Sequence, residues 1–182
     1  MNTIIRKAYW NYEKEEKWLN EMSAKGLALT DYSWWKYAFT DCQPGEYIYR
    51  LELLRHRPEH PASQEYVQFM EDNCAEHIAS YMRWVYFRKK ASDGTFDIYS
   101  DADNRIKHYM RVLQLFAVFS IINIVCCLLN IRAGLLLPSQ GGYMNFIAAG
   151  MNGFIGIALF VSLCRPLVKK IRELKKGRVI RE

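Results

Sequence analysis

A run of twenty uncharged residues, Val112–Ile131, constrains this chain more than any other part of its sequence. As an α-helix rising 1.5 Å per residue, such a run is roughly 30 Å long, the thickness of the hydrocarbon core of a bilayer. A second uncharged run, Tyr143–Cys164, follows after a short connection. The pair predicts a transmembrane helical hairpin over residues 101–164, with spans at about 110–131 and 143–164.

Two buried core helices of a soluble protein are the alternative, but neither run has the polar face that such helices usually carry. Lysine and arginine flank the runs on one side, whereas the connection between them holds one such residue, Arg132. Cytoplasmic flanks of spans are enriched in these residues. This asymmetry predicts a multi-pass membrane protein with both termini in the cytoplasm and the Pro138–Gly142 turn outside.

The net charge is concentrated after the second run. The chain has a formal net charge of +6, and residues 165–182, with eight basic and two acidic residues, account for all of it. We expect this juxtamembrane tail to lie along an anionic inner leaflet as a basic helix, with no direct contact to nucleic acid. The lipid-facing residues would be Lys169, Lys170, Arg172, Lys175, Lys176 and Arg178.

Residues 1–100 predict a cytoplasmic α+β domain. Strand patterns at 3–10, 27–33, 35–40, 47–54, 77–81, 83–88 and 95–99 alternate with helical patterns at 11–25 and from residue 63. The order β-α-β-β occurs twice, and a shift of 48 residues superimposes the apolar stripes of the two helices. We expect pseudo-duplicated β-α-β-β units forming one antiparallel sheet, with two helices on one face and a short closing strand. Shared patterning without duplication would give the same match.

The sequence also predicts how the two spans pack. Ala149 and Gly153 are four residues apart and Gly156 extends their groove, so a partner helix can approach closely. Asn123 and Asn152 lie near the middle of their spans, where an unpaired amide is costly. We expect them to bond each other across the hairpin. The alternatives are bonds to the backbone of their own helices or to another copy in a homo-oligomer.

All five tryptophans lie in the first hundred residues, beside many tyrosines. These aromatic side chains could simply fill the core and cover the sheet. They could instead line a cleft for an apolar ligand or a partner helix. The candidate cleft residues are Trp10, Trp18, Trp34, Trp35, Tyr37, Trp84 and Tyr86.

No catalytic constellation stands out in the sequence. His56 and His60 have the spacing of two zinc ligands on a helix, but Pro58 disfavours a helix there and no further ligand cluster is near. Glu15 and Glu16 could act as acid and base, yet a place at a helix start explains them through the helix dipole. We therefore expect no enzyme activity, no metal site and no cofactor.

Four segments carry a family resemblance: EEKWLNEMSAKGLAL, PGEYIYRLEL, WVYFRKKASDGTFDIYSD and RIKHYMR. Over residues 14–111 the chain resembles an uncharacterised bacterial family, the domain of unknown function 2812. Its members end in hydrophobic spans, and their genes often lie beside PadR-type transcription regulators. The chain departs from the family at Cys74-Ala75, where Gly-Trp is common. The resemblance implies a bacterial cell membrane and a regulatory partner, and it carries no activity.

Two functions fit these features. The first is a membrane-tethered cytoplasmic sensing and interaction module that regulates a co-encoded PadR-type transcription regulator. The second is a sensor that binds a small amphipathic molecule or peptide antibiotic in an aromatic-lined cleft. The duplicated unit is similar in outline to drug-sensing domains that resemble gyrase inhibitors, and those bind ligands between their halves.

Overall fold

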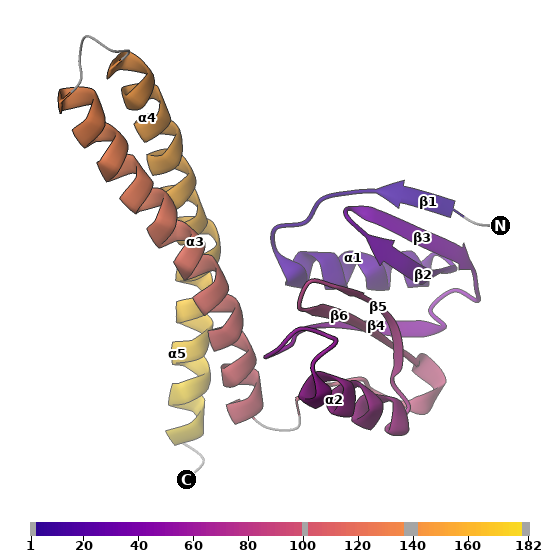
Figure 1. The fold of residues 1–182 in the computed structure, drawn as a ribbon. Coiled ribbons are helices and arrows are strands. Elements are labelled where there is room, and N and C mark those ends of the chain that lie inside the picture. The colour runs from indigo at the N-terminus through magenta and orange to yellow at the C-terminus, as the bar shows by residue number, and fades with distance from the viewer. Residues whose placement is uncertain (1–2, 100–101, 137–141, 180–182) are drawn as a thin grey trace. The chain divides into compact units, whose positions relative to one another are not determined.

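A computed structural model describes residues 3–99, 102–136 and 142–179. It divides the chain into two compact units, Met1–Ser100 and Asp101–Glu182, which we call the N-terminal unit and the hairpin unit (Figure 1). The Pro138–Gly142 turn falls outside the described residues, apart from Gly142 itself.

The N-terminal unit repeats one arrangement twice. Its first half holds β1 (Thr3–Arg6), α1 (Tyr12–Ala24), β2 (Leu27–Ser33) and β3 (Lys36–Asp41). Its second half holds β4 (Tyr47–Leu53), α2 (Pro61–Asp72), β5 (Glu76–Tyr81) and β6 (Trp84–Lys90). Each half forms an antiparallel sheet, in the orders β1-β3-β2 and β4-β6-β5. The predicted α+β class and the doubled β-α-β-β order are confirmed, whereas the expected single sheet is two sheets of three strands.

Backbone irregularities recur at the same 48-residue shift. The pairing of β2 with β3 slips between Leu29 and Asp31, and that of β5 with β6 slips between His77 and Ala79. A sequence match could reflect similar patterning alone, but a bulge changes the direction of a strand at one position. Bulges at matched positions therefore support a true structural repeat.

Left-handed backbone conformations follow the same shift. Gly26, which follows α1, has φ 82°, and Cys74, which follows α2, has φ 65°. Both helices are therefore followed by a residue with positive φ, although Cys74 is not a glycine. The turns after β2 and β5 match as well, with φ 39° at Trp34 and 55° at Met82.

The expected closing strand at 95–99 is wrong. After β6 the chain makes a short 3₁₀ turn, Ala91–Asp93, and residues 95–98 form no strand. Phe96 is instead buried in the second hydrophobic core, and Ile98 packs against that core. Alternating apolar residues here anchor a segment by side-chain packing and not by backbone pairing.

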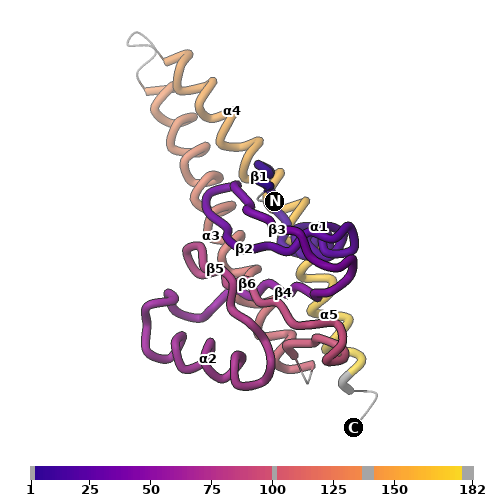
Figure 2. The backbone as a smooth tube through the Cα atoms, turned by 90° about the vertical axis from the view of Figure 1, so that its right-hand side faces the viewer, coloured from indigo at the N-terminus to yellow at the C-terminus, as the bar shows by residue number. Residues whose placement is uncertain are grey.

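Helix α1 packs on both sheets, against β2 of the first and β4 of the second (Figures 1 and 2). Its apolar face contributes Trp18, Leu19 and Met22 to the larger core. The same core contains side chains from both halves, namely Leu29, Tyr32, Tyr37, Phe39, Tyr49, Leu51, Ala79 and Tyr86. Helix α2 covers the opposite face of the second sheet, which is therefore buried on both sides.

Polar side chains of α1 occupy the free edge of β4. Asn20 bonds both backbone groups of Tyr49: its Oδ1 accepts from the amide at 2.9 Å, and its Nδ2 donates to the carbonyl at 3.1 Å. The Ser23 hydroxyl likewise bonds both backbone groups of Tyr47: it accepts from the amide at 3.2 Å and donates to the carbonyl at 2.7 Å.

Glu16 extends this contact by one helical turn. Its Oε2 accepts from the Leu51 amide at 3.0 Å, and its Oε1 accepts from the Arg50 guanidinium at 3.3 Å. An open strand edge is a template for aggregation, and burying it without partners is costly. One face of α1 thus replaces the missing neighbour strand of β4.

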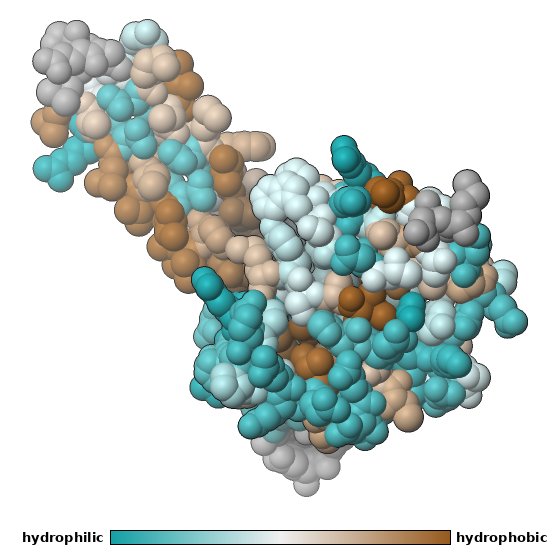
Figure 3. Space-filling model, turned by 45° about the vertical axis from the view of Figure 1, so that its right-hand side comes forward, coloured by the Kyte–Doolittle hydropathy of each residue, from teal (hydrophilic) through white to brown (hydrophobic). Residues whose placement is uncertain are grey.

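The hairpin unit consists of two long helices. The first is α3 (Ala102–Leu136), and the second runs through α4 (Gly142–Leu159), a π-helical segment η2 (Phe160–Cys164) and α5 (Arg165–Val179). Both are long and apolar enough to cross a membrane. Apolar side chains cover much of the exposed surface of this hairpin (Figure 3).

The small residues of α4 that the sequence singles out lie against α3. Ala149 is buried, and a Cβ added to Gly153 would lie 3.2 Å from Cys127 Sγ. A Cβ added to Gly156 would lie 2.9 Å from a carbon of Ile124. Glycine is required at this closest approach because α3 leaves no room for a side chain.

The expected bond between Asn123 and Asn152 is wrong. The Asn123 amide donates to the Phe119 carbonyl of its own helix at 2.9 Å, which was one of the alternatives. The polar bond across the hairpin is made by the buried Ser120 hydroxyl, which donates to the Gly156 carbonyl at 2.8 Å. A helical backbone carbonyl one turn away is always within reach of an asparagine, whereas a partner amide requires matched depth and rotation.

The basic tail also differs from the expected helix along the membrane surface. Helix α5 continues α4 and packs against α3, and it buries Leu167 and Ile171. These two residues are four apart and form an apolar stripe that holds α5 in the helix pair. The prediction of a surface helix rested on charge alone. The apolar stripe was not recognised in the sequence because it is short and interrupted by lysines.

We predict that Gly156→Val destabilises the hairpin while Gly150→Val does not. The added side chain would overlap Ile124 and the Ser120 carbonyl, and overpacking of this kind costs about 1–3 kcal/mol. Gly150 is the matched control because a Cβ there meets nothing within 4 Å. Thermal unfolding in detergent, followed by circular dichroism, measures the difference. Equal melting temperatures of the two variants would contradict the packing.

Candidate functional site

A buried carboxyl group lies where α1 meets both sheets. Asn11 caps α1 and accepts from the Glu13 amide at 2.9 Å, which fixes where the helix begins. This start places Glu15 on the same face as the core residues Trp18 and Leu19, three and four positions later. Glu15 is accordingly only 7% exposed.

Two tyrosines from different sheets bind the Glu15 carboxyl group. The hydroxyl groups of Tyr37 on β3 and Tyr86 on β6 each donate to its Oε1 at 2.7 Å. The ring of Tyr32 lies 4.7 Å from each of these rings, centroid to centroid. One carboxyl oxygen therefore joins the two halves of the repeat inside a wall of tyrosine rings.

Burial controls the acid–base behaviour of this cluster. It raises the pKa of Glu15 above 4.5, and the two tyrosine bonds offset only part of that rise. Burial and the neighbouring Glu15 charge raise the pKa values of Tyr37 and Tyr86 far above 10.0, so both hydroxyls stay neutral donors. Neutral donors do not balance the charge of an ionised Glu15.

Ring contacts extend from the surface to this carboxyl group. Trp34 is 65% exposed, and its ring lies 6.0 Å from that of Tyr81. The ring of Tyr81 lies 5.7 Å from Tyr32, which touches both tyrosines that bind Glu15. One series of aromatic contacts thus connects an exposed tryptophan with the tyrosines that bind the buried acid.

The structure divides the candidate cleft residues into three groups. Tyr37 and Tyr86 bind Glu15. Trp18 packs edge-on against Tyr37, with ring centroids 4.8 Å apart. Trp84 lies 5.2 Å from Tyr12, and both tryptophans pack against the core that contains Tyr37 and Tyr86.

The remaining three tryptophans are exposed. Trp34 and Trp35 form a ring pair at 5.1 Å in the turn between β2 and β3. Trp10, in the loop before α1, is 71% exposed. Whether any of these residues binds a ligand stays a prediction.

Sequence reasoning assigned Glu15 to the helix dipole and missed its burial and the role of Tyr32. A signal was present: Glu15, Trp18, Leu19 and Met22 follow the i, i+3, i+4, i+7 pattern of a core-facing stripe. A lone carboxylate within such a stripe indicates a buried acid with specific partners.

Histidine and the other metal-binding residue types form no cluster of three within the part of the chain that the structure describes. The rings of His56 and His60 stack at 4.2 Å. His60 also caps α2, where its Nδ1 accepts from the Ala62 amide at 3.2 Å. The helical zinc pair considered from the sequence is thus a capped turn.

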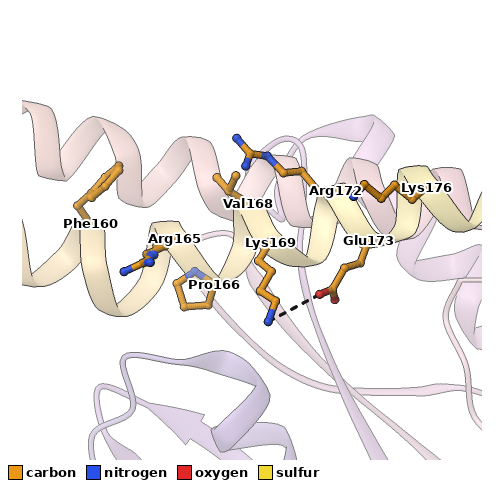
Figure 4. A pocket seen from close by; sticks show the side chains of 8 residues that line it. All are labelled: Phe160, Arg165, Pro166, Val168, Lys169, Arg172, Glu173 and Lys176. Carbon is orange, nitrogen blue, oxygen red and sulfur yellow. Dashed lines mark ion pairs between the residues drawn. The ribbon is translucent and has the colours of Figure 1, made fainter.

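The predicted lipid-facing cations lie on more than one face of α5. Lys169, Arg172 and Lys176 line a groove along the helix together with Phe160 and Arg165 (Figure 4). Within that groove, the Lys169 ammonium lies 3.9 Å from the Glu173 carboxylate.

Another of these cations faces α3: the Lys170 ammonium lies 5.7 Å from the Tyr109 ring. Lys175 is exposed, and the side chain of Arg178 lies outside the described residues. Lipid contact by these cations stays a prediction.

The fold and the site define a class: a duplicated β-α-β-β unit with a buried acid, followed by a long apolar hairpin. A family model described as "Protein of unknown function (DUF2812)" matches residues 11–121. This match covers more than half of the chain, so the chain belongs to this family. No curated protein and no solved structure matches it. The resemblance seen in the sequence is confirmed, and the PadR-type partner stays a prediction.

We predict that Glu15→Gln raises the free energy of unfolding at pH 7. A carboxyl group whose pKa is raised by folding stabilises the protein most below its ordinary value of 4.5. That contribution is lost as the pH rises through the raised pKa. Glutamine keeps an oxygen for the tyrosine hydroxyls and carries no charge. Urea unfolding in detergent, followed by tryptophan fluorescence, should therefore show a smaller loss of stability above pH 4.5 for this variant.

Two further variants complete this test. Glu15→Ala leaves buried hydroxyls without their acceptor, which costs about 1–3 kcal/mol. Glu21→Gln, on the exposed side of α1, should change nothing. If the free energy of unfolding of Glu15→Gln depended on pH in the same way as that of the wild type, the claim that Glu15 is a buried titrating acid would be contradicted.

Proposed function

We propose that this protein is a membrane-anchored sensor whose N-terminal unit binds a lipophilic organic cation at Glu15. In this proposal the hairpin crosses the membrane of a bacterial cell and both termini are cytoplasmic. The uneven distribution of lysine and arginine supports that orientation.

The observation that carries the proposal is the buried Glu15 carboxylate with two tyrosine donors and no balancing charge from them. An ionised group in such a place lowers stability unless a partner compensates it. A cation enclosed by aromatic rings gains from the carboxylate and from the ring faces together. A hydrated inorganic ion fits this wall of rings poorly, because the tyrosine faces cannot replace its water shell.

Binding at Glu15 would act on the junction of the two halves. Because Tyr37 and Tyr86 come from different sheets and share one carboxyl oxygen, a cation that takes up this oxygen weakens both bonds. The two sheets could then shift relative to each other, which is a change that another protein can detect. A PadR-type transcription regulator is the receiver that the family resemblance implies.

We predict that tetraphenylphosphonium gives a saturable change in tryptophan fluorescence of the full chain in detergent. Glu15→Gln should weaken its binding at least about tenfold, which corresponds to roughly 1.4 kcal/mol for a lost charge pair. Triphenylphosphine oxide, a neutral probe with similar rings, should show no such dependence on Glu15.

Glu21→Gln is the matched control, since it removes a carboxylate from the exposed face of the same helix. Equal affinity of the wild type and Glu15→Gln for the phosphonium cation would refute the proposed site. Stable folding of Glu15→Gln is expected, so loss of binding would not reflect unfolding.

A further inference from the structure

The turn between β2 and β3 presents two large aromatic side chains to solvent. Trp34 and Trp35 are 65% and 45% exposed. Both have left-handed backbone conformations, with φ 39° and 62°, which are unfavourable for bulky residues. A short turn occupied by polar residues or glycine would avoid both the exposure and the strain, so the folding of the turn does not require tryptophan.

A second exposed apolar residue lies beside this pair. Met82, the residue equivalent to Trp34 in the second half, is 76% exposed in the turn between β5 and β6. The ring contact between Trp34 and Tyr81 places the two turns next to each other, and both lie at the same end of their sheets (Figure 1). The two turns thus form one apolar tip, defined by Trp34, Trp35, Tyr81 and Met82.

Cations surround this tip. A surface pocket is lined by Trp34 and Trp35 together with Arg6, Lys7 and Lys36, and none of its lining residues is acidic. The backbone amide of Lys7 donates to the Trp35 carbonyl at 2.9 Å, which fixes the base of the turn. Tryptophan flanked by lysine and arginine is the composition that binds the headgroup region of anionic membranes.

The tether brings the N-terminal unit within reach of such a surface. If the uncharged run from Val112 forms the first span, helix α3 extends from Ala102 over ten residues before entering the hydrocarbon. Ten helical residues span roughly 15 Å, which is similar to the radius of gyration of a 100-residue domain, about 13 Å. A tether of this length keeps the headgroups within reach of one face of the N-terminal unit.

We infer that this face is the apolar tip, which docks onto the anionic cytoplasmic leaflet with its tryptophans among the headgroups. The inference rests on the membrane anchoring in the proposed function, but it does not depend on a ligand at Glu15. Docking would place the exposed end of the series of aromatic contacts, at Trp34, against the lipid layer in which amphipathic cations accumulate.

Quenching by brominated lipid tests this docking directly, because all five tryptophans lie in the N-terminal unit and none in the hairpin unit. The full chain would be placed in nanodiscs of phosphatidylglycerol and phosphatidylcholine, with acyl chains brominated near the glycerol backbone. The expected result is quenched fluorescence that is lost for the most part in Trp34→Phe/Trp35→Phe. Trp10→Phe, which removes an exposed tryptophan outside the turn, should keep most of the quenching.

Charge gives a second readout that does not alter the rings. Arg6→Glu/Lys36→Glu should reduce quenching in nanodiscs that contain phosphatidylglycerol, and high salt should reduce it in the wild type. Insertion of the hairpin into nanodiscs without quenching would overturn the docking and leave the anchoring intact. Quenching that persists in Trp34→Phe/Trp35→Phe would have the same meaning. Failure of the hairpin to insert would overturn both. A tip that binds another protein instead would show no quenching by lipid.

Discussion

The contact between α1 and the edge of β4 holds the N-terminal unit together. The two three-stranded sheets also meet through β2 and β5 and through a shared core, and sheets of this size are barely stable alone. Glu16, Asn20 and Ser23 lie at helical spacing and satisfy alternate backbone groups of β4. Because each bond joins a helix of the first half to a strand of the second, the two halves fold as one body. The apolar face of the same helix then fills the space between the sheets.

The candidate site depends on this arrangement. Once α1 is held between the sheets, its first turn places Glu15 where tyrosines from both sheets donate to it. A buried acid is a poor source of stability, and an apolar residue of similar size would pack there at lower energetic cost. Its presence at the junction of the two halves is consistent with a role in binding. The exposed tryptophans at the end of the aromatic series are the second departure from what folding alone requires.

Much of the fold could be predicted because it depends on local periodicity. The bounds of β2, the presence of the two helices and the small-residue groove of α4 follow from the spacing of residues within short segments. The prediction of a closing strand at 95–99 was wrong because Phe96 and Ile98 alternate as in a strand but pack on a core. The predicted bond between Asn123 and Asn152 was wrong because a helix offers each asparagine a backbone carbonyl of its own, whatever its depth in the membrane. The burial of Glu15 could have been predicted from its place on an apolar stripe. Its partners Tyr37 and Tyr86 could not, because tertiary packing brings them near and sequence spacing does not indicate that packing.

Hydrogen exchange at the edge of β4 tests the central claim, that α1 closes this edge and joins the halves. The amides of Tyr47, Tyr49 and Leu51 point away from β6 and toward α1. An open edge strand exchanges such amides far faster than amides paired within a sheet. We expect these three amides to exchange as slowly as those of Ile48 and Arg50, which lie between them on β4. Rapid exchange at Tyr47, Tyr49 and Leu51, with slow exchange at Ile48 and Arg50, would show an open edge and contradict the account.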